Sequence, residues 1–301
     1  MNSFAEILII ALFTSTACAL PGNFLALRKM SMLTDAISHT VLLGIITAFL
    51  ICGDLSSPFL IIGATIMGVF TVWLIELLYN SKLVASDSAI GLIFPLLFSI
   101  GVILITRYAG NVHLDTDCVL LGELAFAPFD RLVINGIDYG AKGIYISGLI
   151  LLIVSSLITL FYKEIKLATF DPILCATLGF SPLLIHYGLM SLVSLVAVTS
   201  FQSIGSILVI AFMIIPAMTA TLWTRTLTSR LILSCLLGAA GSILGILGAI
   251  YLDTSLAGMM AAILGILFII SLIIAPSTGL LASFQRKKNQ QFAFGRETLL
   301  Q

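Results

Sequence analysis

The longest charge-free stretch of the chain, PILCATLGFSPLLIHYGLMSLVSLVAVTSFQSIGSILVIAFMIIPAMTATLWT, runs from residue 172 to residue 224. It contains 53 residues without Lys, Arg, Asp or Glu, whereas one helix needs about 20 apolar residues to cross a bilayer. Polar and small residues interrupt the stretch near its middle, at Thr199, Ser200, Gln202, Ser203 and Gly205. Because the stretch is too long for one crossing, it predicts two transmembrane helices that join near Gly205.

Similar stretches fill the chain on both sides of this one. Seven further runs without charged residues are long enough to span a bilayer, at residues 7–27, 36–53, 55–75, 88–106, 143–162, 231–252 and 254–285. Of all residues, 60% are hydrophobic and only 9% are charged, against about 25% charged residues in soluble domains. The sequence therefore predicts an all-α, polytopic transmembrane helical bundle of about nine spans, with eight as the alternative.

Positive charges give the expected orientation of these helices. If Arg28 and Lys29 lie inside, eleven of the fourteen Lys and Arg residues lie inside, and only Arg107, Arg131 and Lys142 lie outside. Because cytoplasmic loops are rich in Lys and Arg, this bias predicts an outer N-terminus and a cytoplasmic C-terminus. The first run lacks a preceding basic segment, so it is expected to stay as a helix and not to be cleaved. The net charge of zero offers no basic surface for nucleic acid.

Glycine spacing predicts a close contact between two of the helices. Gly241 and Gly245 form a GxxxG pair within the run at 231–252, and small residues at this spacing let helix backbones approach closely. The partner helix is expected within the same chain, with another subunit as the alternative.

Two polar connections are expected on opposite sides of the membrane. An outer loop covers residues 107–142, and an inner segment covers residues 163–182, which read KEIKLATFDPILCATLGFSP. Asp171 followed by Pro172 is typical of a helix start, because Asp caps the first turn and Pro is tolerated in it. A short amphipathic helix on the cytoplasmic side would suit the docking of a soluble partner.

Motifs for several enzymatic functions are missing from the sequence. It contains no GxxxxGK[ST] loop for ATP, no HExxH pair for a zinc protease and no GxSxG nucleophile turn. Its three histidines are His39, His113 and His186, too few for a self-contained catalytic metal centre. The chain is therefore expected not to be an enzyme, and to have no nucleotide-binding site and no bound cofactor.

Asp35 and His39 are the polar residues that most need an explanation. They stand four residues apart in a segment with helical periodicity, MSMLTDAISHTVLLGI, so both side chains project from one face of the second span. Ionisable groups in a span usually face a cavity, a partner or a translocation path. A carboxylate and an imidazole suit Mn, Fe or Zn, and two ligands on one helix make a weak, releasable metal site. The alternative is a structural hydrogen bond between helices.

Other ionisable residues give weaker signals. His113, Asp115 and Asp117 place ligand atoms at alternate positions of the outer loop, where they could receive a cation, although such runs are more often simply solvated. Glu76 lies near the inner end of the third span and is expected to extend its carboxylate toward the interface. His186 is expected to be a packed or interfacial histidine and not a ligand.

Several segments resemble one known family. Residues 28–44, RKMSMLTDAISHTVLLG, resemble the R-R-M-S-L-x-G-D-A-L-S-H-A-V-L-P-G segment of the bacterial ABC importer permeases for manganese, zinc and iron. Residues 164–179, EIKLATFDPILCATLG, are similar to the family's E-L-K-L-x-S-F-D-P-E-L-A-x-x-L-G, and residues 205–220, GSILVIAFMIIPAMTA, to its G-x-L-L-V-x-A-L-L-I-x-P-A-A-T-A helix. The final span, after Asp253, Thr254 and Ser255, also lies where the family carries a D-x-P/S-x-G turn before its last helix. The chain departs from the pattern at Leu43, where the family usually has proline, and at Thr40, where it has alanine.

The resemblance implies a role for most of the chain. Residues 1–285 would form a transmembrane permease domain in the bacterial cytoplasmic (inner) membrane, and residues 286–301 a cytoplasmic tail. The permease would pair with a second copy or a sister permease, dock cytoplasmic ATP-binding subunits and accept metal from an extracytoplasmic metal-binding protein. By position, Asp35 and His39 become metal contacts on the translocation path. Phe170, Asp171 and Pro172 become the segment that couples to the ATPase.

Three other functions remain as alternatives. A secondary metal transporter could be driven by a proton or sodium gradient, with Asp35 and His39 as a proton relay. An intramembrane enzyme is disfavoured by the missing motifs. A membrane scaffold would have little reason to keep a carboxylate and an imidazole within a span.

Overall fold

The structure, a computed structural model, describes residues 3–53, 59–108, 124–134 and 137–275. Within these ranges, nine helices are long and apolar enough to cross a membrane, which confirms the predicted all-α bundle. They are α1 (Ser3–Leu27), α2 (Met32–Cys52), α3 (Phe59–Asn80), α4 (Ser86–Tyr108), α6 (Lys142–Leu160), α9 (Pro182–Ile204), α10 (Ser206–Trp223), α11 (Leu227–Leu252) and α12 (Leu256–Ile274). The predicted tail at 286–301 lies outside the described residues.

The long charge-free stretch divides where its polar residues predict. Helix α9 ends at Ile204, and Gly205 has a φ of 81°, a backbone conformation that favours glycine over other residues. Helix α10 begins at the next residue. The first residues of the stretch form no span, because they belong to the inner segment, which folds into α7 (Tyr162–Phe170) and α8 (Pro172–Thr177).

The start of α8 matches its sequence signature. Asp171 is the N-cap, and its Oδ1 accepts a hydrogen bond from the backbone N–H of Leu174 at 2.9 Å. Pro172 occupies the first turn, where a missing N–H leaves no helix bond unmade. The predicted cap is therefore confirmed, and it fixes the angle between α7 and α8.

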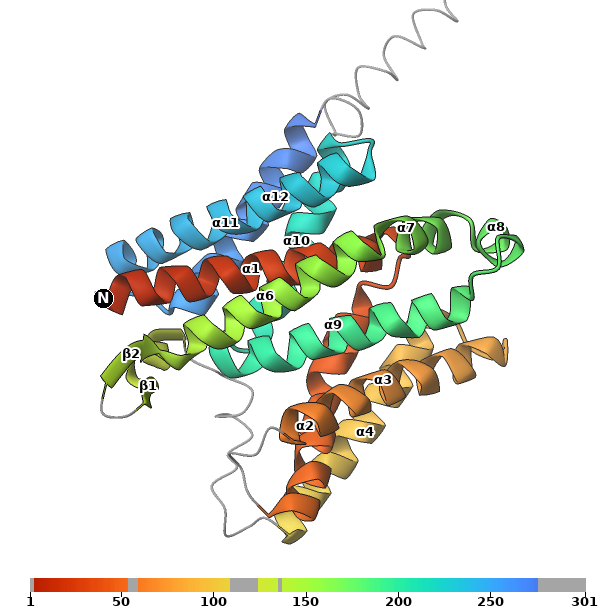
Figure 1. Ribbon diagram of the computed structural model, residues 1–301, viewed down its shortest axis with the longest axis horizontal. Helices are drawn as coiled ribbons and strands as arrows, with labels where there is room; N and C mark the ends of the chain where they lie inside the picture. The colour runs from red at the N-terminus through yellow and green to blue at the C-terminus, as the bar shows by residue number, and fades with distance from the viewer. Residues whose placement is uncertain (1–2, 54–58, 109–123, 135–136, 276–301) are drawn as a thin grey trace, which may run out of the picture.

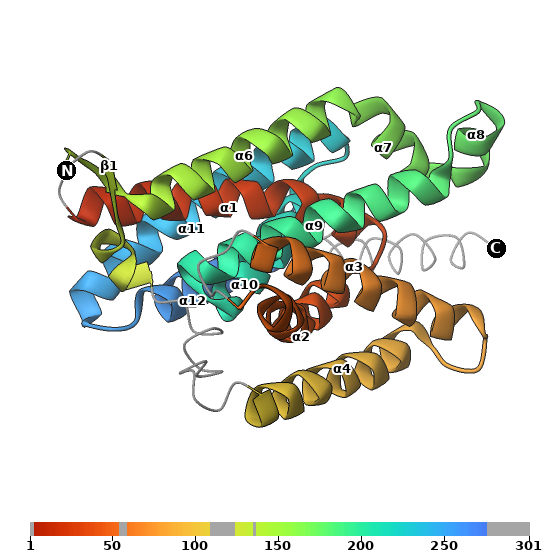
Figure 2. The same cartoon turned by 60° about the horizontal axis from the view of Figure 1, so that its bottom comes forward.

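The helices form two groups that α9 connects. Helix α1 packs against α6, α10 and α11, and α12 packs against α10 and α11. Helices α2, α3 and α4 pack against one another, while α9 contacts both α1 and α3. In Figure 1, α2, α3 and α4 lie below α9, whereas α1, α11 and α12 lie above it. Figure 2 shows α4 on the outside of its group, with α2 between α4 and the rest of the bundle.

Small residues let several helices approach closely. A Cβ atom at Gly245 of α11 would overlap Met260 of α12, and one at Gly241 would overlap Leu264. The GxxxG pair therefore packs within the chain, as predicted. A similar contact joins α2 and α3, where a Cβ at Gly44 would lie only 2.6 Å from Cα of Ala64.

A small hairpin lies near the start of α1 and was not predicted from the sequence. Strand β1 (Arg131–Ile134) pairs antiparallel with β2 (Ile137–Ala141), directly after the 3-10 helix η1 (Leu124–Phe129). These elements occupy the second half of the expected outer loop. The hairpin covers the first turn of α1, whose Glu6 is fully buried.

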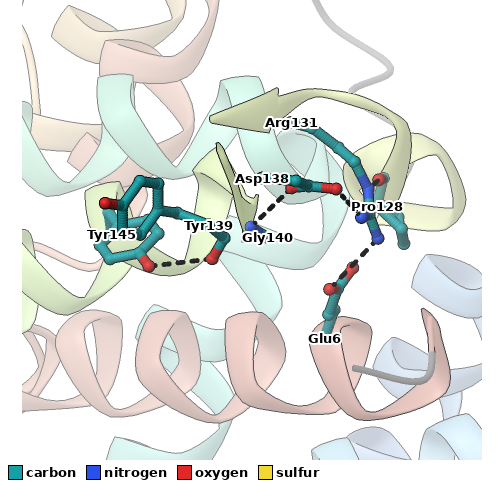
Figure 3. Close-up of polar contacts among 7 residues, drawn as sticks. All are labelled: Glu6, Pro128, Arg131, Asp138, Tyr139, Gly140 and Tyr145. Carbon is teal, nitrogen blue, oxygen red and sulfur yellow. Dashed lines mark hydrogen bonds and ion pairs between the residues drawn. The ribbon is translucent and has the colours of Figure 1, made fainter. Parts of the chain in front are cut away.

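Charges fasten the hairpin to α1 (Figure 3). Arg131 Nη2 lies 3.5 Å from Glu6 Oε1, and Arg131 Nη1 donates to Asp138 Oδ2. The other oxygen of Asp138 accepts from the Gly140 backbone N–H at 2.9 Å. This N–H, together with Arg131, holds the pKa of Asp138 below its usual range. The cluster leaves Glu6 with one ion-pair partner and, among the described residues, no hydrogen bond.

Candidate functional site

Helix α2 presents Asp35 and His39 on one face, as their spacing predicts. Asp35 lies in the first turn of the helix, and His39 lies one turn later. His39 Nε2 is 3.5 Å from Asp35 Oδ1. The side chains are 35% exposed for His39 and 43% exposed for Asp35. Both ligand atoms are therefore accessible from outside this single chain.

The two residues next to His39 in the sequence are buried, and their polar groups are hydrogen-bonded. Ser38 and Thr40 are fully buried. Their hydroxyl groups donate to carbonyls one turn earlier, and Thr71 of α3 donates to the Thr40 hydroxyl at 2.9 Å. Threonine at position 40 thus gains a partner on α3 that alanine would not have. The Thr71–Thr40 bond joins α2 to α3, while Asp35 and His39 stay partly exposed.

Two aromatic rings of α4 hold the imidazole. His39 stacks on Phe94 with ring centroids 5.6 Å apart, and Phe98 meets it edge-on at 5.8 Å. Aromatic packing restricts the side-chain rotamer of His39. Phe94 and Phe98 of α4 thus support the site, and the sequence did not predict this role. Their only sequence signal is a pair of phenylalanines four residues apart in a span.

Asp35 and His39 provide only part of a metal-ligand set. A carboxylate oxygen and an imidazole nitrogen are both ligands for borderline divalent ions. Among the described residues, no group of three or more His, Cys, Asp or Glu side chains is placed to hold a metal ion. The pair by itself provides two ligand side chains, which suits brief binding better than permanent retention.

The predictions for the other candidate residues differ in how they compare with the structure. His113, Asp115 and Asp117 lie outside the described residues, so their prediction is untested. Glu76, which is expected to extend toward the interface, has a carboxylate that contacts His186 Nε2 and accepts a hydrogen bond from Tyr187 Oη at 2.8 Å. His186 is packed, with 15% of its side chain exposed, as predicted.

The inner segment presents an apolar surface next to its cap. Around the elbow between α7 and α8, Phe170 is 59% exposed and Ile173 is 79% exposed. Asp171 and Pro172 are also exposed. Among the nearby large side chains, further exposed ones are Leu174, Leu178, Phe180, Leu183 and Leu184. Helix α8 lies at one end of the bundle in Figure 1, where a soluble partner could reach it.

Comparisons with known proteins agree on one family. The model of the ABC 3 transport family matches residues 1–275. The manganese transport system membrane protein MntD of Bacillus subtilis is 43% identical over 291 residues, which cover 97% of this chain and 98% of that protein. The zinc transport system membrane protein TroD of Treponema pallidum is 46% identical over 278 residues, covering 91% of this chain and 74% of that protein.

A solved structure has the same fold. One chain of PsaBC from Streptococcus pneumoniae, solved in complex with Fab, superposes with a TM-score of 0.76 at 30% sequence identity. The match covers 92% of this chain and 94% of that chain. The arrangement of the helices is therefore that of an already solved structure.

Proposed function

This chain belongs to the ABC 3 transport family, and on that premise we propose that it is the membrane-spanning subunit of an ATP-driven importer for a divalent transition metal ion. The chain is a multi-pass protein of the bacterial inner membrane and a component of metal transport. Relatives named for manganese and for zinc make Mn²⁺ and Zn²⁺ the first candidate substrates, with Fe²⁺ as a third. Energy comes from a separate ATP-binding subunit.

The half-exposed pair on α2 is the observation that carries this proposal. Asp35 and His39 lie within a helix that is otherwise apolar enough to span a membrane, yet both remain accessible. Ionisable groups at such positions are costly in lipid, so they face water or another protein. The pair therefore lines the metal path, where it replaces part of the hydration shell of the ion during its passage.

A second permease subunit, either an identical copy or a sister chain, completes this path. Two side chains are fewer than the four ligands that Zn²⁺ usually takes in proteins. A facing subunit with its own carboxylate and imidazole would supply the rest. It would also shield Asp35 and His39 from lipid.

The inner segment is the docking site of the ATP-binding subunit. Phe170, Asp171 and Pro172 form the elbow between α7 and α8, and exposed apolar side chains surround it. Contiguous apolar surface at the end of a membrane bundle is typical of a protein contact. On the other side, an extracytoplasmic binding protein delivers the ion, and His113, Asp115 and Asp117 are candidates to receive it.

Uptake into proteoliposomes tests the source of energy. We expect the permease, reconstituted with its ATP-binding subunit and binding protein, to import radiolabelled Mn²⁺ or Zn²⁺ only when ATP is supplied. The matched control is a complex whose ATP-binding subunit binds ATP without hydrolysing it, and that complex should import no metal. Uptake that persists in this control and disappears when an ionophore removes the proton or sodium gradient would contradict the proposal. That result would favour the secondary transporter.

A further inference from the structure

A polar bridge, formed by Arg28, Thr169, His186 and Glu76, links elements that are far apart in the sequence. Arg28 directly follows α1. Its Nη1 lies 2.8 Å from His186 Nδ1 of α9, and its Nε and Nη2 donate to Thr169 Oγ1 of α7 at 3.3 and 3.1 Å. On its other side, the His186 ring contacts Glu76 of α3 through Nε2. We refer to these residues as the Arg28 bridge.

The contacts fix the protonation of His186. Arginine can only donate hydrogen bonds, so Nδ1 of His186 must accept from Arg28 and carries no proton. Nε2, on the other side of the ring, lies in ion-pair contact with the carboxylate of Glu76. The imidazole thus lies between a guanidinium at Nδ1 and a carboxylate at Nε2.

Burial makes this bridge stiff. The side chains of His186 and Glu76 are 15% and 21% exposed. Burial lowers the pKa of Arg28, and the charge of Glu76 opposes that shift. Charged groups removed from water depend strongly on the partners they have, because breaking one contact leaves a charge uncompensated. The bridge therefore resists separation of α3, α7, α9 and the end of α1.

Two residues of the Arg28 bridge lie next to the regions that the proposed function uses. These regions are the docking elbow and the first turn of α2. Thr169 directly precedes Phe170 and Asp171 of the docking elbow. Arg28 begins the tight turn to α2, in which Lys29 has a φ of 59° and Met30 N–H bonds to Leu25 O at 2.9 Å. Since this turn is closed by its own hydrogen bonds, a displacement of Arg28 also displaces the first turn of α2, which carries Asp35.

We propose that the Arg28 bridge transmits movement of the docked ATP-binding subunit to the helix that carries Asp35 and His39. This inference rests on the proposed function of the chain. Arg28, Thr169 and His186 are positioning residues in this scheme, because they act on the ion only through α2. Their loss should uncouple the two activities of the complex, so that ATP is hydrolysed while little metal moves.

The test compares uptake and ATP hydrolysis in the same proteoliposomes. The full complex carries wild-type permease, Arg28→Met, Thr169→Val or His186→Ala, and both rates are measured with radiolabelled Mn²⁺. Thr169→Val removes the link from Arg28 to α7, together with a hydroxyl bond to the Ile165 carbonyl one turn earlier, and keeps the side-chain volume, so it tests the bridge with little risk to folding. Lys29→Met is the matched control, because it removes a positive charge from the same turn without touching the bridge.

We expect Mn²⁺ uptake per ATP hydrolysed to fall by about ten-fold in Thr169→Val and further in the other two variants. Lys29→Met should match the wild type. His186→Gln should also retain most of the coupling, because glutamine can accept from Arg28 and donate to Glu76. If the role of His186 were purely structural, His186→Gln and His186→Ala would have the same Mn²⁺ uptake per ATP hydrolysed.

The possible failures are distinguishable. Wild-type complex without ATP-dependent uptake would refute the proposed function and the coupling role with it. Wild-type uptake together with an unchanged ratio in Thr169→Val and His186→Ala would refute the coupling role alone. A parallel fall of hydrolysis and uptake in both variants would also overturn it, because the bridge would then only hold the fold together.

Discussion

Three carboxylates in the transmembrane helices have different surroundings. Glu6 is fully buried under the hairpin and has Arg131 as its ion-pair partner. Glu76 is bound by His186 and Tyr187. Asp35 is 43% exposed, and within the described residues its one ion-pair partner is His39 on the same helix. Of these three, Asp35 is thus the one whose carboxylate remains able to bind an ion from outside this chain.

Removing Arg131 should weaken the outer end of the bundle. Arg131→Ala leaves the buried Glu6 carboxylate without its charge partner, which destabilises the folded state. We expect a lower unfolding temperature in detergent for Arg131→Ala, and recovery of most of the loss in the Glu6→Gln and Arg131→Ala double variant. Equal unfolding temperatures for the single and double variants would show that Glu6 does not depend on Arg131.

Local patterns made part of the site predictable. The spacing of Asp35 and His39 places them on one helix face because a helix repeats about every 3.6 residues. The partners of His39 on α4 and those of Glu76 on α9 could not be predicted, because they depend on how distant helices pack. Tyr187 follows Glu76 by 111 residues, and nothing near Glu76 in the sequence indicates this contact.

At the scale of elements, the contribution of the Asp171 cap to the stability of α8 and to docking can be tested. Helix α8 has six residues, so its stability depends strongly on its first turn. Asp171→Ala removes the cap and should cost about 1 kcal/mol, which weakens binding of the ATP-binding subunit by about five-fold if the elbow is the docking site. Asp171→Asn keeps a capping oxygen and should bind nearly as well as the wild type.

Affinity of the solubilised permease for its ATP-binding subunit measures this effect. If Asp171→Asn binds as weakly as Asp171→Ala, the charge of Asp171 and not its capping role is what the partner recognises. If neither variant changes the affinity, the elbow is not the docking site.

The close contact of α2 with α3 gives a second prediction for the elements. A Cβ at Gly44 would lie 2.6 Å from Ala64 Cα and 2.8 Å from Gly63 O, so the backbones must separate in Gly44→Ala. Such overpacking costs about 1–3 kcal/mol. We expect a lower unfolding temperature for Gly44→Ala than for Gly265→Ala, since a Cβ at Gly265 meets no described atom within 4 Å. Equal stability of the two variants would contradict this packing.

The order of the helices could be predicted from the sequence more readily than the short hairpin that lies between two of them. The break at Gly205 and the start of α8 at Asp171 follow from local residue types, and both occur as predicted. The hairpin at residues 131–141 was missed because its strands have four and five residues, too few to show an alternating pattern. Its stability comes from Glu6 of α1, which lies far away in the sequence.

On the scale of the whole molecule, the single chain leaves extensive apolar surface uncovered. Helices α3, α4 and α12 expose large side chains along their length, including Ile66, Ile103 and Ile269, each more than half exposed. Lipid can cover most of this surface. The exposed pair on α2 needs a polar partner, which accords with a transport path formed between two permease subunits.

Metal uptake by variants of Asp35 and His39 tests most directly whether this pair contacts the transported ion. The complex with its ATP-binding subunit and binding protein is reconstituted with wild-type permease, Asp35→Ala, His39→Ala or Asp87→Ala. The last variant removes an exposed carboxylate from the first turn of α4 and serves as the matched control. Association with the ATP-binding subunit is measured on the same preparations, so that a loss of uptake is not confused with a loss of assembly.

We expect wild type and Asp87→Ala to take up Mn²⁺ or Zn²⁺ at similar rates when ATP is present. Asp35→Ala and His39→Ala should lose more than about ten-fold of that uptake while they still bind the ATP-binding subunit, because each removes a metal ligand. Uptake by both variants at the wild-type rate would contradict the account, since Asp35 and His39 would then have no contact with the transported ion.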